Sequence, residues 1–317
     1  MTLRLGTRGS ALALAQSQLT ADAVTAATGR PVELIEIVTP GDRSSAPVQR
    51  LGVGVFVSAL RDALLAKEID FAVHSFKDLP TAEVPELAIA AVPRREDPRD
   101  VLVARDGLSL SELPPSATVG TGALRRIAQL KALGLGLRTT PIRGNVDSRL
   151  RRVATGELDA VVLARAGLAR LGRAAEATET LDPALMLPAP AQGALAVECR
   201  ADDTDLVAAL SALDHPATRA AVTAERALLA TLEAGCSAPV AALAELGADD
   251  ELFLRGAVFS EDGRHAIRLS RTGSPAEAGE IGRLLALDLL AAGADRLFVP
   301  AGAGEADQND AVPGSAQ

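Results

Sequence analysis

Hydrophobic and polar positions in the first hundred residues alternate between the period of a strand and the period of a helix. Short apolar segments of strand character are expected at residues 3–7, 32–38, 71–74 and 87–92. Ser10 is a suitable N-cap for a helix that runs to about residue 27, and residues 55–66 also have helical periodicity. Strands and helices in this order predict a largely parallel sheet. The polar stretch at residues 39–49 is expected to be a loop over a site.

The same alternation is repeated from residue 101 to about residue 188. Strands are expected near Val101 and Val119 and over residues 138–142 and 160–163, with helices between them. The charged segment at residues 93–100 contains two prolines and is the best candidate for a hinge. Three further prolines mark a second crossing, after which residues 194–199 form a strand that could return to the first sheet. Two lobes joined twice enclose a cleft, and open α/β sheets bind ligands at the carboxyl ends of their strands.

The pattern changes near Asp214. A long helix over residues 216–233 precedes short strands at residues 240–243, 252–259 and 266–270, and a second helix covers residues 275–290. This order predicts a small α+β domain with an antiparallel sheet. Residues 301–317 are Gly, Ala and polar residues without periodicity, typical of a disordered tail.

The fold class that follows is α/β. We expect two similar lobes of the periplasmic-binding-protein type around a hinged cleft, plus a smaller C-terminal α+β domain with a three-stranded antiparallel sheet. The expected boundaries are residues 1–93 with 194–211 for the first lobe, 99–187 for the second lobe, 215–300 for the C-terminal domain and 301–317 for the tail.

Composition narrows the class of protein. With 317 residues, 48% hydrophobic and 23% charged, the chain has the composition of a soluble globular protein of two or three domains. No apolar run approaches 18 residues, and the N-terminus has no apolar signal core, so a cytoplasmic protein without a membrane partner is expected. Trp and Tyr are absent and the net charge is −9, which argues against nucleic acid as a partner.

Positive charge is nevertheless concentrated between Thr121 and Arg152. This segment contains one acid, Asp147, and eight basic residues: Arg125, Arg126, Lys131, Arg138, Arg143, Arg149, Arg151 and Arg152. Arginine binds carboxylate or phosphate through paired hydrogen bonds. A small ligand with several negative charges is therefore the first hypothesis, and solvated helix faces are the alternative for individual residues.

The positions of some of these arginines favour the ligand. A strand at residues 117–120 leads through a tight turn at Thr121 into a helix that begins with Arg125 and Arg126, so free backbone N–H groups lie beside the arginine pair. The segment 141–149 repeats the arrangement with Arg143 and Arg149. Arg151 and Arg152 fall on other faces of that helix, where solvent exposure is expected.

The two cysteines differ in their surroundings. Cys199 lies in an apolar alternation and is expected to be a packed thiol without a chemical role. Cys236 lies between Gly235 and Pro239 just after a helix, and the pattern leaves a buried structural thiol and a nucleophile equally open. Neither a disulfide framework nor the spacing of a metal site is present.

Asp78 lies near the end of a strand that stops at Pro80. The adjacent Lys77 favours an ionised carboxylate, which could stabilise a cation, while a carboxylate that only stabilises a turn is the alternative. His74 is expected to be a satisfied strand histidine, and Phe76 is expected to belong to the core.

Taken in order, several short motifs resemble the porphobilinogen deaminase (hydroxymethylbilane synthase) family from about Leu3 to Leu290. They are residues 4–10 (RLGTRGS), 74–80 (HSFKDLP), 119–126 (VGTGALRR), 143–146 (RGNV), 224–227 (AERA) and 232–236 (LEAGC). Each motif is weak alone, and the ordered set is highly specific.

The resemblance implies that Cys236, in the C-terminal domain, carries a dipyrromethane cofactor through a thioether and that Asp78 is the catalytic carboxylate. The implied substrate is porphobilinogen, four molecules of which are deaminated and joined head to tail before water releases the linear tetrapyrrole. Asp78 would stabilise the azafulvenium cation that forms when ammonia leaves. Residues implied to bind substrate or cofactor are Arg8, Ser10, Lys77, Thr121, Arg125, Arg126, Arg143, Asn145, Arg149 and Arg170. The family also implies a monomer.

The chain departs from the family pattern at three places. Residues 51–54 lack a lysine that is common there, serines common in the anion turn appear as Gly122 and Ala123, and the usual Gly-Gln-Gly appears as residues 191–193. Two other functions stay open. A non-catalytic two-lobed anion-binding protein would leave Cys236 without a role, and a cysteine acyl-transfer enzyme would need His74, His215 or His265 near that thiol.

Overall fold

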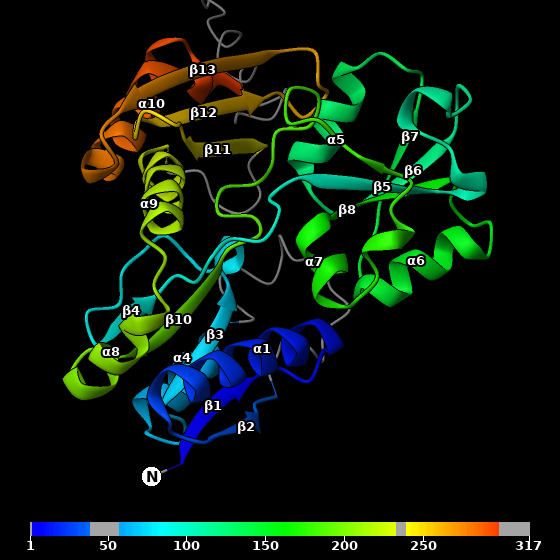
Figure 1. Ribbon diagram of the computed structural model, residues 1–317. Helices are drawn as coiled ribbons and strands as arrows, with labels where there is room; N and C mark the ends of the chain where they lie inside the picture. The colour runs from blue at the N-terminus through cyan, green and yellow to red at the C-terminus, as the bar shows by residue number, and fades with distance from the viewer. Residues whose placement is uncertain (1, 39–56, 233–238, 298–317) are drawn as a thin grey trace, which may run out of the picture.

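The computed structural model of the protein describes residues 2–38, 57–232 and 239–297. Within these residues the strands form three sheets, two of five strands and one of three (Figure 1). The expected architecture of two similar α/β lobes and a C-terminal domain with a three-stranded antiparallel sheet is confirmed. The loop predicted at residues 39–49, Cys236 and the predicted tail lie outside the described residues.

The sheet of the first lobe has the strand order β2-β1-β3-β10-β4. Its strands are β1 (Leu3–Thr7), β2 (Val32–Glu36), β3 (Phe71–Ser75), β4 (Leu87–Ala91) and β10 (Leu195–Arg200). β1 pairs in parallel with β2 and β3, whereas β10 runs antiparallel to both of its neighbours, β3 and β4. The expected return of residues 194–199 to the first sheet is confirmed, and the largely parallel sheet is interrupted only by this returning strand.

Helices cover the sheet of the first lobe. They are α1 (Ala11–Thr28), α4 (Ser58–Leu65) and α8 (Thr204–Leu210). The Ser10 side chain accepts a hydrogen bond from the Ala13 N–H at 3.3 Å, so the expected N-cap is confirmed. Leu5, Phe71 and Val24 are fully buried between the helices and the sheet, where they exclude water from the lobe's core.

The second lobe repeats this plan in the strand order β7-β6-β8-β5-β9. Its strands are β5 (Asp100–Ala104), β6 (Thr118–Thr121), β7 (Arg138–Pro141), β8 (Ala160–Ala164) and β9 (Glu179–Thr180). Its helices are α5 (Leu124–Ala132), α6 (Val146–Ala154) and α7 (Arg165–Arg170). In each lobe the strand that follows a crossing from the other lobe, β5 or β10, lies antiparallel beside the third parallel strand.

The C-terminal domain packs an antiparallel sheet against two helices. It consists of α9 (Pro216–Thr231), β11 (Val240–Leu246), β12 (Leu252–Phe259), β13 (Ala266–Gly273) and α10 (Ala278–Ala291). Leu228 of α9, Leu285 of α10 and Leu254 of β12 are fully buried in one cluster. A second cluster joins Phe259 of β12 to Ala128 of α5, so this sheet also packs on the second lobe.

Short 3₁₀ helices complete the secondary structure. They are η1 (Phe76–Asp78), η2 (Arg105–Gly107), η3 (Leu110–Glu112), η4 (Ala174–Glu176), η5 (Ser211–Leu213), η6 (Pro275–Glu277) and η7 (Ala294–Leu297). Among the described residues, no helix is both long enough and apolar enough to cross a bilayer.

Candidate active site

Asp78 lies on a 3₁₀ turn rather than in the strand where the sequence pattern placed it. β3 ends at Ser75, and the Leu79 N–H donates to the Phe76 carbonyl at 3.2 Å to close the turn η1. The Asp78 side chain is exposed on this turn, while Phe76 is buried in the core as expected. The turn therefore presents Asp78 at the end of a parallel strand, the position where open α/β sheets bind ligands.

His74 faces away from this chemistry. Its Nε2 lies 3.1 Å from Oε2 of Glu198, and the same carboxylate accepts from Nη2 of Arg61 at 2.8 Å. His74 and Glu198 are both buried. The prediction of a satisfied strand histidine is confirmed.

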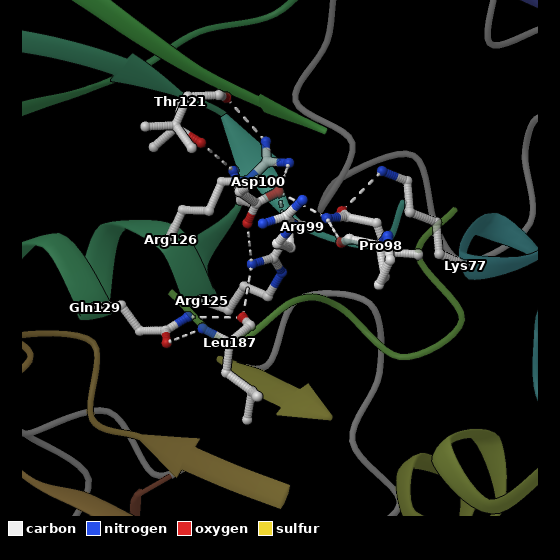
Figure 2. Close-up of polar contacts among 12 residues, drawn as sticks. Lys77, Pro98, Arg99, Asp100, Thr121, Arg125, Arg126, Gln129 and Leu187 are labelled. Atoms are coloured by element: carbon white, nitrogen blue, oxygen red, sulfur yellow. Dashed lines mark hydrogen bonds and ion pairs between the residues drawn. The ribbon is translucent and has the colours of Figure 1, made fainter. Parts of the chain in front are cut away.

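Asp100 binds both arginines of the pair at the start of α5. Arg125 Nη1 donates to Oδ2 of Asp100 at 2.7 Å, and Arg126 Nη2 donates to Oδ1 at 2.7 Å, as Figure 2 shows. Both arginines are only 5% exposed, and Asp100 is fully buried. Burial would raise the pKa of the Asp100 carboxyl, but the two guanidinium groups outweigh burial and hold that pKa well below its usual range.

Gln192 connects this ion cluster to the first lobe. Its Nε2 donates to Oδ1 of Asp100 at 2.7 Å, and its Oε1 accepts from Arg125 Nη2 at 3.1 Å and from Lys77 Nζ at 3.3 Å. Gln192 is fully buried and belongs to the second crossing, whereas Asp100 ends the first crossing. A single amide therefore joins both crossings to the residue next to Asp78.

Positive charge around Asp78 exceeds the negative charge that could neutralise it. Burial, together with Arg126 and Arg125, lowers the pKa of Lys77 to about 8, although Asp78 and Asp100 oppose the shift. Burial, together with Arg126 and Arg143, lowers the pKa of Arg149 to about 10, and Asp78 again opposes the shift. Lys77, Asp78, Arg125, Arg126, Arg143 and Arg149 thus form a single electrostatic group.

Two guanidinium atoms in this group lack protein partners. Within the described part of the chain, Arg143 Nη1 and Arg126 Nε are buried without a hydrogen-bond partner. A buried unpaired donor costs free energy, so such atoms are expected to have partners in the working protein. These free donors can therefore bind the carboxylate oxygens of a ligand beside the exposed carboxylate of Asp78.

The side chains of three predicted binding residues accept hydrogen bonds from backbone N–H groups. Ser10 caps α1, the Asn145 Oδ1 caps α6 by accepting from the Ser148 N–H at 2.9 Å, and the buried Thr121 Oγ1 accepts from the Ala123 N–H at 3.4 Å. Each of these three contacts lies where a strand passes into a helix, the arrangement that the sequence predicted. Arg8 is half-buried at the end of β1.

Arg170 contacts the crossing segments. Its Nη2 donates to the Gly193 carbonyl at 2.6 Å; burial lowers its pKa, and the charge of Glu96 opposes that shift. Arg170 also borders a pocket of about 660 Å³ between α1 and the segment around Pro93. The contacts of Arg170 are with the crossings, and its predicted place in the ligand cleft stays a prediction.

Two departures from the family pattern have structural correlates. A Cβ at Gly122 would lie 2.7 Å from the Ile142 carbonyl oxygen, so a serine at this position requires a shift of the turn after β7. Ala191 has a φ of 60°, a left-handed conformation that costs about 1 kcal/mol for a residue with a Cβ. The glycine that is common there would adopt it without this cost.

The described cysteine, Cys199, is fully buried in the core of the first lobe. This burial confirms the prediction of a packed thiol, and burial, with the charges of Asp203 and Glu198, raises the pKa of the thiol to about 12. Nothing in the described part of the chain gathers three or more His, Cys, Asp or Glu side chains into a metal site.

Sequence reasoning missed Asp100, Gln192 and Arg226. Asp100 closes the charged segment that the pattern identified only as a hinge, and Gln192 was noted only as the centre of residues 191–193. Arg226 belongs to the AERA motif, and it donates to backbone carbonyls of the turn that carries Asp78. A polar residue at the end of a crossing is the signal that could have indicated the first two.

Comparison with known families decides the relationship. Residues 3–208 match the family model described as porphobilinogen deaminase, dipyromethane cofactor binding domain, and residues 219–291 match the porphobilinogen deaminase C-terminal domain. The chain belongs to the porphobilinogen deaminase family. The resemblance inferred from the ordered motifs is thereby confirmed, and Cys236 lies within the second match.

Relatives named porphobilinogen deaminase match nearly the whole chain. The protein from Nocardia farcinica is 62% identical over 311 residues, covering 96% of this chain and 90% of its own. Those from Mycobacterium avium and Mycobacterium tuberculosis are each 58% identical over 304 residues, covering 93% of this chain and 96% and 98% of their own.

Solved structures of other proteins align with part of the chain. The methionine binding protein MetQ aligns with a TM-score of 0.42 at 13% identity, and the alignment covers 66% of this chain and 88% of MetQ. A periplasmic substrate-binding protein of an ABC transporter from Coxiella burnetii aligns with a TM-score of 0.44 at 14% identity, with coverages of 71% and 96%.

Proposed function

We propose that this protein is a hydroxymethylbilane synthase, a transferase of tetrapyrrole and heme biosynthesis that deaminates porphobilinogen and joins four molecules into a linear chain. The observation that carries the proposal is the surplus of positive charge around Asp78, with Arg143 Nη1 and Arg126 Nε unpaired. Each porphobilinogen brings two carboxylates. When ammonia leaves the substrate, the remaining ring carries a positive charge. The group therefore supplies what this substrate needs: donors for carboxylates and one carboxylate for a cation.

The same residues fit the dipyrromethane cofactor that the family model names. Its carboxylates are acceptors for the buried guanidinium donors, and their negative charge would oppose the lowering of the pKa values of Lys77 and Arg149 by burial and by the neighbouring arginines. When bound, the dipyrromethane cofactor supplies the terminal pyrrole carbon to which each new unit is joined. Arg125 and Arg126, fixed by Asp100, are proposed to hold its acidic side groups, and Lys77 and Arg143 are proposed to assist them.

Asp78 is proposed to stabilise the positive charge that develops on the substrate ring. Its carboxylate is exposed on the 3₁₀ turn and is close enough to Lys77 and Arg149 to affect their pKa values. A carboxylate held beside a pyrrole N–H becomes most favourable as ammonia leaves, because the ring is then cationic. Arg8, Ser10, Thr121, Asn145, Arg149 and Arg170 complete the proposed set of binding residues.

Attachment of the cofactor through a thioether to Cys236 is proposed from the LEAGC motif. The buried Cys199, whose pKa is raised to about 12, is unsuited to this role because little of its thiol is ionised near neutral pH.

Family membership favours the enzyme over the non-catalytic anion-binding protein. The cysteine acyl-transfer alternative is weakened because His74 is engaged by Glu198 and His215 Nδ1 accepts from the Thr218 N–H at the cap of α9. The monomeric state and cytoplasmic location stay predictions.

Intact mass tests the cofactor. The purified protein should exceed the mass of its 317 residues by two pyrrole units, and Cys236→Ser should lose this adduct while Cys199→Ser keeps it. A fully active chain with no added mass would contradict the proposal.

Turnover tests Asp78. Asp78→Asn should reduce porphobilinogen consumption by about two orders of magnitude or more and keep the adduct, because an amide cannot stabilise the developing charge. The matched control is Glu83→Gln, an exposed acid a few residues along the same segment, which should leave turnover unchanged. Near-normal turnover of Asp78→Asn would contradict the assignment.

A further inference from the structure

Arg226 of α9 reaches out of the C-terminal domain to the turn of the first lobe that carries Asp78. Its Nη1 donates to the Phe76 carbonyl at 3.2 Å and to the Leu79 carbonyl at 2.9 Å, and its Nη2 donates to the Pro80 carbonyl at 2.7 Å. The three carbonyls lie on both sides of Asp78 in the chain. One side chain therefore holds the backbone of η1 before and after this residue.

The guanidinium also stacks on the turn. Its central carbon lies 4.4 Å from the centre of the Phe76 ring, a distance at which a cation is attracted to an aromatic face. Phe76 is itself buried in a cluster with Val222, one helical turn before Arg226 on α9. The stack and this apolar contact orient the arginine fork toward the carbonyls.

Only an arginine can make this set of bonds. The planar guanidinium carries five N–H donors in a fixed fork, whereas a lysine ammonium is a point charge on a flexible stem. Hydrogen bonds to three carbonyls in and just after η1 restrict both the translation and the rotation of this turn. The turn is thereby fixed to α9, and Cys236 follows α9 in the sequence.

We propose that Arg226 is a positioning residue that sets Asp78 relative to the domain that carries the proposed cofactor cysteine. This inference rests on the proposed role of Asp78. Arg226 acts through the backbone of η1, and Figure 1 shows α9 standing between the C-terminal sheet and the first lobe. Small displacements of a catalytic group reduce the rate of the chemical step more than they reduce substrate binding.

Arg219 provides a matched control. It lies on the same helix, its Nε donates to Asp214 Oδ2 at 2.8 Å, and its Nη2 donates to the Ile89 and Ala90 carbonyls at 3.3 Å each. Arg219 therefore also ties α9 to the first lobe, but at β4 instead of at η1. A general weakening of this interface would affect both arginines, whereas positioning of Asp78 concerns only Arg226.

The experiment compares Arg226→Gln, Arg226→Lys and Arg219→Gln as full-length protein, with intact mass, melting temperature and steady-state porphobilinogen consumption measured for each. For Arg226→Gln we expect kcat to fall ten- to hundredfold, as a rough estimate, with KM within about twofold and the adduct retained. Arg226→Lys should not restore kcat, and Arg219→Gln should keep kcat within about twofold of the unmodified protein.

The proposal is overturned if Arg226→Gln keeps kcat within about twofold, or if kcat falls equally in the two glutamine variants in step with melting temperature. Should Arg226→Gln not fold, Arg226→Lys decides by the same criteria, since it keeps the charge and most of the buried stem. The Asp78→Asn variant separates the two proposals. If Asp78→Asn is inactive and Arg226→Lys has normal kcat, only the positioning role fails; if Asp78→Asn keeps near-normal turnover, the proposed role of Asp78 itself fails.

Discussion

Gln192 Nε2 lies 2.7 Å from Asp100 Oδ1, although 92 residues separate the two in the chain. Each residue belongs to one of the two crossings between the lobes, so the crossings are bonded to each other inside the protein. The same Asp100 carboxylate pairs with both Arg125 and Arg126, and its single negative charge offsets only one of their two positive charges. The arginines proposed to hold the ligand are therefore fixed at the junction of the lobes.

The Asp100 cluster should contribute strongly to stability. Asp100→Asn removes the only carboxylate shown to bind two buried guanidinium groups in the described residues, and loss of one partner from a buried ion pair costs about 3–5 kcal/mol. Urea unfolding measures this change. Asp97→Asn, on the same segment, breaks partly exposed pairs with Arg99 and Arg165 and should cost less than about 1 kcal/mol. Equal losses would contradict the buried-cluster account.

The same cluster predicts a dependence on acid. The pKa of Asp100 is lower in the folded state, so its stabilising contribution is complete above its unfolded pKa, near 4, and is lost as pH falls through the folded value. The free energy of unfolding should therefore fall more steeply below about pH 4 in the unmodified protein than in Asp100→Asn. Identical slopes would show that Asp100 is not the group responsible.

Gly193 should not tolerate a side chain. Its φ is +87°, and an added Cβ would lie 2.4 Å from the Glu96 carbonyl oxygen of the opposite crossing. Gly172 has a φ of +70° with no described atom within 4 Å of such a Cβ, so Gly172→Ala isolates the backbone strain. We expect Gly172→Ala to cost about 1 kcal/mol and Gly193→Ala clearly more, measured by urea unfolding. Similar costs would mean that the crossings separate easily.

Lys77 should titrate near pH 8. Burial lowers its pKa to about 8, so the folded protein binds fewer protons than the unfolded chain between about pH 8 and 10.5. The cost of burying its charge is present below pH 8 and is relieved as pH rises through this window. The measurement is competitive acetylation of Lys77 against pH in the Cys236→Ser protein, with the denatured protein as control. The same half-titration point in both forms would contradict the predicted shift.

Arg143 should separate binding from stability. Its buried Nη1 has no partner among the described residues, so Arg143→Gln should change the free energy of unfolding of the Cys236→Ser protein by less than about 1 kcal/mol. The same substitution in the intact enzyme should raise KM for porphobilinogen about tenfold, because a carboxylate contact is lost. Arg125→Gln, which removes a partner of buried Asp100, is the destabilising comparison.

Local periodicity was enough to predict most strands, the Ser10 cap and the buried states of Phe76, His74 and Cys199. It did not predict β9, a two-residue strand too short to show a period, or the 3₁₀ turn under Asp78. The roles of Asp100, Gln192 and Arg226 were also missed. Their partners lie far away in the chain, so these contacts exist only after the lobes have packed, and no local pattern reports them.

The position of β10 between β3 and β4 has a consequence for synthesis. On the ribosome, β1 to β4 emerge first, but β3 and β4 pair through β10 and not with each other. The entire second lobe must therefore be translated before the first sheet can close, whereas the second lobe contains all of its own strands in one continuous stretch. A released chain that ends before residue 195 should thus protect β5 to β9 from protease better than β1 to β4.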